Sequence, residues 1–354
     1  MFKSVPVFFL LIVILLFSGC MEEKNNSSKT VKIGLVTDAA GLGDQSFNDS
    51  ANEGLVRAAR ELPVETQVVE SSSMTDYGPN LNAFADLGYN LIFSIGFLTK
   101  DALTESAELY PTTHFGIIDE VVEKPNVISC TFKEEEGSFL AGLMAGFMTK
   151  TGSVGFLGGI DVPLIKKFQT GYEAGVKLAN PDVKVIVKYT GDFEDVSKGK
   201  DLSSILYSQG VDIIYHASGK CGLGAIEAAK NQKKDCYVIG VDGDQDSIGV
   251  VKDNEGNIVK TVVLTSMMKH VDVAIFDVSK LEANGEFISG HRVYGLKEGG
   301  VSLTEMKYTR NKIPESVLAK VEEYREKVIN GEIVVPATQE ELKKFEVETE
   351  KSEK

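Results

Sequence analysis

Three aspartates stand directly after apolar, strand-like runs of the chain: Asp38, Asp119 and Asp242. An ionised carboxylate has two oxygens that accept hydrogen bonds, which suits the neighbouring hydroxyls of a sugar. Each aspartate could instead cap the helix that follows its strand. Three carboxylates at strand ends facing one cleft favour ligand binding, because ligands of open α/β sheets collect at the carboxyl ends of the strands.

Two phenylalanines are the next candidates for binding. Phe47 follows Ser46 at the predicted start of a helix, where Ser46 and Asp49 could form a variant capping box. Phe47 could therefore simply be a core residue of that helix, whereas Phe193 stands in a loop after a strand in the second half of the chain. Two aromatic rings facing each other across a cleft would hold a flat ring, since stacking contributes about 1–3 kcal/mol per base. A flat base together with a diol is a nucleoside.

A glycine and a lysine complete the candidate set. Gly219 follows Ser218 after another predicted strand, and a glycine there lets a ligand or a second lobe approach the backbone. Lys269 lies near an expected crossover between lobes, as either a surface lysine of the hinge or a cation that balances the aspartates. The crowding of negative charge favours the second interpretation.

Patterns typical of enzymes are missing from the sequence. It contains no G-x-S-x-G, no H-E-x-x-H and no P-loop, and its four histidines lie far apart. The glycine-rich run at 219–224 only imitates a dinucleotide-binding loop. We therefore expect a binding protein rather than an enzyme, with no cofactor and no bound metal.

Strands and helices alternate along most of the chain, beginning with a strand, a polar turn and an amphipathic helix over 31–62. Such alternation predicts an α/β fold with doubly wound parallel sheets. We expect a strand over 258–265 and a helix over 267–284 that return to the first lobe. The expected division is lobe 1 at 31–132 plus 263–290, lobe 2 at 133–262 plus 291–330, and a charged C-terminal tail at 331–354.

Bulk composition narrows the range of partners. The 354 residues carry a net charge of −15, with 43% hydrophobic and 25% charged residues, which is ordinary for a globular protein. A nucleic-acid backbone or an anionic lipid surface would need clustered positive charge, so neither is an expected electrostatic partner. The length favours two lobes over a single core.

The first thirty residues differ from the rest. A lysine, an apolar run and small residues over 1–19 predict an export signal, and the run is short of the roughly 20 residues that a membrane span needs. Residues 17–20, FSGC, resemble the bacterial lipobox, although Phe17 stands where leucine is usual, so Cys20 is the predicted site of lipidation. Residues 20–30 read as a flexible tether.

The other cysteines, Cys130, Cys221 and Cys236, have no spacing typical of zinc or redox sites. Cys130 reads as a small core residue. A disulfide between Cys221 and Cys236 stays open from the sequence.

Several segments together resemble the basic membrane protein family of lipoproteins, whose best understood member is a purine nucleoside receptor. The resemblance covers about 31–305. It is carried by Asp38 to Asn48 (DAAGLGDQSFN), FGIID at 115–119, GDF at 191–193, SG at 218–219, GVDGDQ at 240–245 and TSMMK at 265–269.

This resemblance implies a type I periplasmic-binding-protein fold and an ABC importer as partner. It also implies that a purine stacks between Phe47 and Phe193. Base and ribose would be held by the polar residues of the same motifs, namely Asp38, Asn48, Asp119, Asp242 and Lys269. Some members of the family are proposed to bind other ligands, so a riboflavin-like ring, a free sugar, or a sensory role without transport remain alternatives.

Overall fold

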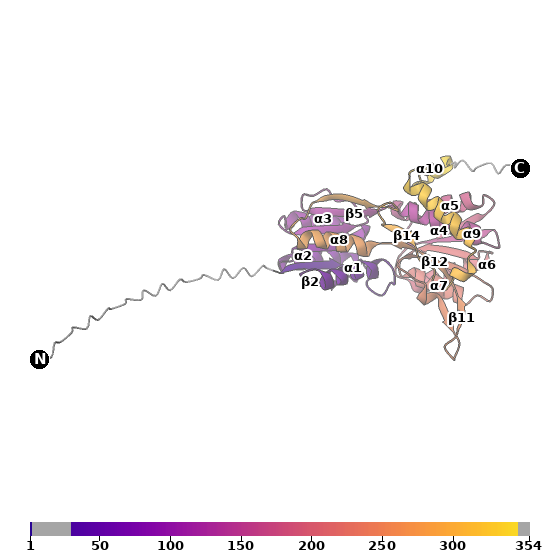
Figure 1. The fold of residues 1–354 in the computed structure, drawn as a ribbon, viewed down its shortest axis with the longest axis horizontal. Helices are drawn as coiled ribbons and strands as arrows, with labels where there is room; N and C mark the ends of the chain where they lie inside the picture. The colour runs from indigo at the N-terminus through magenta and orange to yellow at the C-terminus, as the bar shows by residue number, and fades with distance from the viewer. Residues whose placement is uncertain (2–29, 346–354) are drawn as a thin grey trace. The chain divides into compact units, whose positions relative to one another are not determined.

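The computed structural model describes Met1 and residues 30–345; the predicted signal sequence, Cys20 and most of the tether lie outside the described residues, as does the end of the tail. From Val31 onward the described chain forms one unit that contains two six-stranded sheets (Figure 1). The chain is thus an α/β protein with two lobes, each built on its own sheet.

The first sheet is parallel throughout, and its central strands are almost wholly buried. Its strands in spatial order are β13 (Gly290–Tyr294), β5 (Val127–Phe132), β4 (His114–Ile118), β3 (Leu91–Ile95), β1 (Val31–Val36) and β2 (Val64–Val69). The helices of this lobe are α1 (Phe47–Glu61), α2 (Tyr77–Asp86), α3 (Lys100–Leu109) and α8 (Val271–Ala283). Short 3₁₀ turns, η1 (Met74–Asp76) and η2 (Phe97–Thr99), precede α2 and α3.

The second sheet is parallel except for one edge strand, β14, which runs antiparallel to β12. Its strands in spatial order are β14 (Val301–Leu303), β12 (Val263–Lys269), β9 (Tyr237–Asp242), β8 (Ile213–Ala217), β6 (Ser153–Gly158) and β7 (Lys184–Tyr189). The helices of this lobe are α4 (Glu134–Met148), α5 (Pro163–Ala179), α6 (Val196–Ser208), α7 (Cys221–Lys230), α9 (Glu315–Ile329) and α10 (Gln339–Lys344). Strands β10 (Val250–Lys252) and β11 (Ile258–Thr261) form a separate hairpin, and the turns η3 (Ser247–Gly249) and η4 (Arg310–Lys312) complete the lobe.

Helices α4 and α5 pack with their backbones in close approach. A Cβ atom on Gly142 would lie 2.2 Å from the backbone oxygen of Tyr172, and one on Gly175 would lie 2.1 Å from that of Phe139. Only glycine fits at such positions, so these two residues fix how closely α4 and α5 can pack.

The chain crosses between the lobes three times, at Lys133, at His270 and in 295–300. Backbone hydrogen bonds join these crossings, from Lys133 N to Tyr294 O at 2.9 Å and from His270 N to Gly300 O at 2.9 Å. Three adjacent crossings of this kind form a multi-strand hinge.

Two of the expected lobe boundaries are wrong. Strand β12 pairs with β9 in the second sheet, so the second crossing follows Lys269 instead of preceding 263, and the expected helix from 267 begins only at Val271. Strand β13 pairs with β5 in the first sheet, although 291 onward was expected in lobe 2. An apolar run in the sequence predicts that a strand is buried, but it does not indicate which sheet the strand joins.

Candidate functional site

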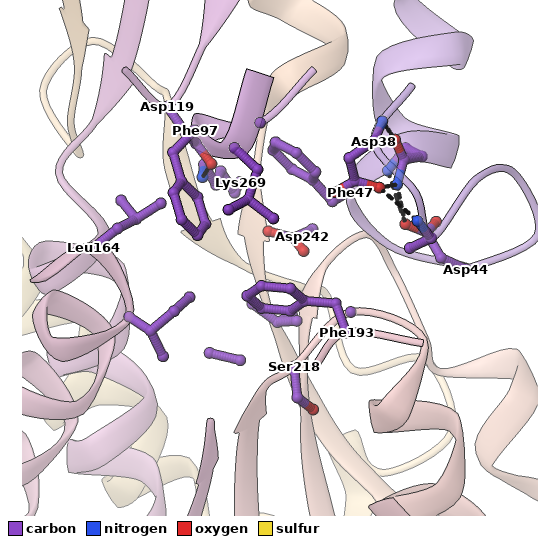
Figure 2. A pocket seen from close by; sticks show the side chains of 18 of the residues that line it. Asp38, Asp44, Phe47, Phe97, Asp119, Leu164, Phe193, Ser218, Asp242 and Lys269 are labelled. Atoms are coloured by element: carbon purple, nitrogen blue, oxygen red, sulfur yellow. Dashed lines mark hydrogen bonds and ion pairs between the residues drawn. The ribbon is translucent and has the colours of Figure 1, made fainter. Parts of the chain in front are cut away.

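The carboxyl ends of strands from both sheets border one cavity, which encloses about 580 Å³ including the part open to solvent. All eight predicted ligand-binding residues line it. Figure 2 shows the side chains of Asp38, Phe47, Asp119, Phe193, Asp242 and Lys269 around the cavity. The predicted residues are Asp38, Phe47, Asn48, Asp119, Phe193, Gly219, Asp242 and Lys269. The structure therefore brings together residues that lie as much as 231 positions apart in the sequence.

The loop after β1 is held by carboxylates and by one amide. Asn48 Nδ2 donates to Asp38 Oδ1 at 2.8 Å and to Asp44 Oδ2 at 3.2 Å, while Asn48 Oδ1 accepts from the backbone N–H of Asp38 at 3.2 Å. Burial raises the pKa of Asp38 to about 6, although its hydrogen bond from Asn48 works in the opposite direction. Asn48 thus fixes the orientation in which Asp38 faces the cavity.

The predicted capping box of Ser46 and Asp49 is wrong. Asp44 caps helix α1 instead, because its carboxylate accepts from the backbone N–H groups of Ser46, Asn48 and Asp49 at 2.8–3.1 Å. The carboxylate of Asp49 instead accepts from the backbone N–H groups of Gly43 and Gln45 in the same loop, at 2.8 and 2.9 Å. Ser46 is thereby free to make a different contact.

Ser46 Oγ donates to Asp242 Oδ2 of the other lobe at 2.6 Å. Asp242 is buried at the end of β9, and burial raises the pKa of its carboxyl to about 7, with the nearby charge of Lys269 opposing the rise. Asp242 and Asp119 accept hydrogen bonds from the side chains of Ser46 and Lys269, so capping of the helix that follows each strand does not explain these two aspartates.

Lys269 is the cation at the centre of the site, with 1% of its side chain exposed. Its ammonium lies 2.6 Å from Asp119 Oδ2 and 3.2 Å from Glu134 Oε1. The rings of Phe47, Phe132 and Phe168 surround it at 5.0, 5.1 and 5.5 Å from their centroids. The interpretation of Lys269 as a balancing cation agrees with this placement.

One oxygen atom and two backbone conformations at this site are unusual. Asp119 Oδ1 is buried without a hydrogen-bond partner among the described residues, which leaves an acceptor at the cavity. Burial raises the pKa of Asp119, and the charge of Lys269 counteracts the rise. Asp119 and Asp242 both have positive φ, 71° and 64°, a conformation uncommon outside glycine that directs the two carboxylates at the cavity.

Phe47 and Phe193 lie on opposite sides of the space around Asp242 (Figure 2), one from each lobe. Gly159 is required for this, because a Cβ atom there would lie 2.1 Å from the Phe193 ring. Gly219, with φ of 52°, lies against the backbone of Phe193 and so shapes the same loop. The geometry leaves two aromatic faces beside a set of hydrogen-bond acceptors.

Sequence reasoning missed the apolar wall of the cavity. The missed lining residues are Phe97, Leu98, Leu164, Ile165, Phe168 and Ala217. Phe97 meets Phe193 edge to face, with ring centroids 6.3 Å apart. Phe97 could have been predicted, because it follows Gly96 at the end of a strand. Phe168 could not, because a phenylalanine within helix α5 has the same sequence pattern as a core residue.

No group of three or more His, Cys, Asp or Glu side chains within residues 30–345 is arranged to hold a metal ion. Cys130, Cys221 and Cys236 are buried free thiols, so Cys221 and Cys236 are not paired in this structure. Among the described helices, none is both long and apolar enough to span a membrane.

The chain is similar to known proteins of one family. Residues 31–339 match the family described as "ABC transporter substrate-binding protein PnrA-like". The chain is 36% identical over 338 residues to the "ABC transporter nucleoside-binding protein BmpA" of Lactococcus lactis, covering 90% of this chain and 94% of that protein. It is 40% identical over 324 residues to a "CD4+ T-cell-stimulating antigen" of Listeria innocua, covering 88% and 90% of the two chains.

A solved structure of an ABC transporter system solute-binding protein from Aeropyrum pernix is similar in fold. Its TM-score is 0.78 at 28% identity, with 89% of this chain and 96% of that chain covered. The two-lobed architecture with a cavity between the lobes is thus the type I periplasmic-binding-protein fold. The chain belongs to the family of PnrA-like ABC transporter substrate-binding proteins.

Proposed function

We propose that this protein binds a nucleoside, preferably a purine nucleoside, between its two lobes and delivers it to an ABC importer. Proteins of its family are solute-binding proteins, not enzymes. The observation that carries the proposal is the pairing of Phe47 and Phe193 across one cavity with the carboxylates of Asp38, Asp119 and Asp242. The name of the Lactococcus lactis relative, a nucleoside-binding protein, supports it.

The base would stack between the two phenylalanine rings, where burial of both faces suits a flat heterocycle. Asp38 would accept hydrogen bonds from the base edge, with Asn48 holding it in place. The hydroxyls of the ribose would meet Asp119, Asp242 and Lys269. Asp119 Oδ1 is well suited, because it is a buried acceptor that no described residue satisfies.

A thermal-shift screen over purine nucleosides, pyrimidine nucleosides, riboflavin and free sugars tests the ligand class. A ligand that binds the folded state raises the unfolding temperature by mass action. We expect the largest rise with a purine nucleoside and none with the sugars. A rise with riboflavin or a sugar alone would replace the proposal by one of those ligands.

The proposal includes a lipid anchor at Cys20, which rests on the lipobox-like residues 17–20 alone. Several buried acyl chains would hold the protein stably at the outer face of the cell membrane. Membrane fractionation tests this point: the Cys20→Ala variant should leave the membrane fraction, while wild type should remain in it. If both proteins were found in the membrane fraction to the same extent, Cys20 would not be a lipid anchor.

Delivery to permease subunits follows from the family and from the hinge. Closure of two lobes about three crossings changes the surface at the mouth of the cavity, which a permease can distinguish. Uptake of labelled nucleoside by cells lacking this protein should fall relative to the parent strain. Unchanged uptake together with altered gene expression would instead favour a sensory receptor.

A further inference from the structure

Two side chains of lobe 2 hold the loop between β1 and α1 of lobe 1, and neither lines the ligand cavity. Lys220 Nζ donates to the backbone oxygen of Ala40 at 2.7 Å and contacts that of Leu42 at 3.4 Å. Gln245 Nε2 donates to the backbone oxygen of Gln45 at 3.0 Å. These contacts exist only while the two lobes are close together.

Gln245 has a fixed orientation because of a buried histidine. His216 is fully buried, and burial lowers its pKa to about 4, so its ring is neutral. His216 Nε2 lies 2.8 Å from Gln245 Oε1, which can only accept, so Nε2 carries the proton. The opposite amide orientation would place Oε1 against the Gln45 carbonyl, and two acceptors would then face each other.

The chain leaves room for this pair at two glycines. A Cβ atom on Gly222 would lie 2.0 Å from His216 Cε1, and one on Gly240 would lie 2.5 Å from Gln245 Oε1. Ser266 Oγ also accepts from the backbone N–H of Gln245 at 3.1 Å. The Gln245 amide is thereby held rigidly in lobe 2 with its donor aimed at lobe 1.

The receiving loop is shaped to meet that donor. Gln45 has φ of 52°, in the left-handed region, and its backbone N–H is held by Asp49 Oδ2 at 2.9 Å. Two residues later comes Phe47, which lines the cavity. The position of the Gln45 carbonyl is thus coupled by a short, well-bonded stretch of chain to one wall of the ligand site.

We propose that Lys220 and the His216–Gln245 pair form an interlobe latch, which stabilises the closed protein and sets ligand affinity without touching the ligand. This inference rests on the proposed function for its ligand. A binding protein with a fractionally populated closed state has an apparent dissociation constant that rises as that fraction falls. Lys220, Gln245 and His216 are therefore positioning residues that act through closure.

Two variants test the latch. Lys220→Met removes the ammonium but keeps the apolar stem, and it leaves no buried group of lobe 2 unpaired. Gln245→Glu keeps an oxygen for His216 but replaces the donor that faces Gln45. Lys230→Met is the matched control, because Lys230 is the last residue of helix α7, which Lys220 directly precedes, and it pairs with Glu227 at 2.7 Å, within lobe 2.

The first readout needs no ligand. Spin labels on cysteines introduced at the exposed positions Glu105 in α3 and Asp201 in α6 report the distance between lobes by electron paramagnetic resonance. The full chain with Cys20→Ser is used, since the other native cysteines are buried. We expect Lys220→Met and Gln245→Glu to shift the distances of the ligand-free protein towards longer values, and Lys230→Met to match wild type.

The second readout is the dissociation rate of the purine nucleoside, measured by stopped flow. Loss of one latch hydrogen bond should weaken affinity by about three- to tenfold, mostly through faster dissociation. Unchanged distances in both latch variants would overturn the inference, as would weaker affinity at unchanged distances. If Gln245→Glu does not fold, Lys220→Met decides. If no nucleoside binds wild type, the proposed function fails while the distance measurement still tests the latch.

Discussion

Ser46 and Asp242, which come from different lobes and lie 196 positions apart in the chain, share a hydrogen bond of 2.6 Å. The bond joins the loop after the first strand of one sheet to the end of β9 in the other. Because Phe47 follows Ser46 directly, the same contact positions one aromatic wall of the cavity relative to the carboxylates of the opposite lobe. The site therefore exists only as a product of both lobes.

The aromatic pair predicts how affinity responds to mutation. Phe47→Leu and Phe193→Leu keep an apolar side chain but lose the flat ring, so each should weaken nucleoside binding by about tenfold or more. Phe287→Leu is the control, since its ring stacks on His114, which does not line the cavity. Calorimetric titration measures all three. Equal affinity in wild type and both cavity variants would contradict stacking.

Lys269 predicts a large effect on stability. Lys269→Met leaves the buried carboxylate of Asp119 without its cation and Glu134 with Lys167 alone, so the free energy of unfolding should fall by about 3–5 kcal/mol. Adding Asp119→Asn should recover part of the loss, because it removes the carboxylate that is left unpaired, whereas Glu134 still pairs with Lys167 at 2.6 Å. Urea unfolding at pH 7 measures both proteins.

A surface pair provides the comparison for Lys269. Lys100 pairs with Glu120 at 3.1 Å with 45% of its side chain exposed, so Lys100→Met should cost less than about 1 kcal/mol. If Lys269→Met and Lys100→Met were equally stable, the buried cluster would not be the charge-balanced unit described above.

The buried carboxylates predict that the ligand-free protein becomes less stable as pH rises. The pKa of Asp242 is raised to about 7 and that of Asp38 to about 6, against an ordinary value of 3.8. The folded state therefore binds more protons than the unfolded state between about pH 4 and 7. The stabilisation that these two carboxyl groups contribute is fully present below their pKa in the unfolded chain. It is lost as the pH rises through their pKa in the folded protein.

Asp242→Asn isolates one part of this effect, because the amide oxygen still accepts from Ser46 but never ionises. At pH 8 the variant should be more stable than wild type by up to about 4 kcal/mol, and at pH 4 the two should be similar. Chemical denaturation at the two pH values measures the difference. A variant that is less stable at pH 8 would show that the ionised Asp242 is stabilising.

The charge of the cavity predicts rejection of phosphorylated ligands. Its lining has four carboxylates, at Asp38, Asp44, Asp119 and Asp242, and Lys269 already pairs with Asp119. A nucleoside 5′-monophosphate adds about −1.5 to −2 charges. We expect it to bind at least about a hundredfold more weakly than the nucleoside, since like charges at 4 Å repel by about 4 kcal/mol near a protein surface.

A neutral 5′-substituted nucleoside separates charge from size in that comparison. 5′-Methylthioadenosine should bind within about tenfold of adenosine if the phosphate is rejected for its charge. If the neutral analogue is rejected as strongly as the monophosphate, the restriction is steric.

The strand ends could be predicted from the sequence because each aspartate or glycine directly follows an apolar run, and the resemblance to a known family reinforced them. The assignment of β12 could not, because strand periodicity does not say which sheet a strand joins. Lys269 fell within the expected helix at 267–284, although it ends strand β12. From the sequence Ser46 was a candidate helix cap, but in the structure the carboxylate of Asp44 caps helix α1. Glu134, the second partner of Lys269, gave no signal among three successive glutamates.

Isothermal titration calorimetry of wild-type protein with adenosine, guanosine, inosine, uridine and cytidine tests the central claim most directly. The account predicts saturable one-to-one binding of at least one purine nucleoside, tighter than binding of either pyrimidine nucleoside. Folded protein that binds none of the three purine nucleosides, or that prefers uridine or cytidine, would contradict it.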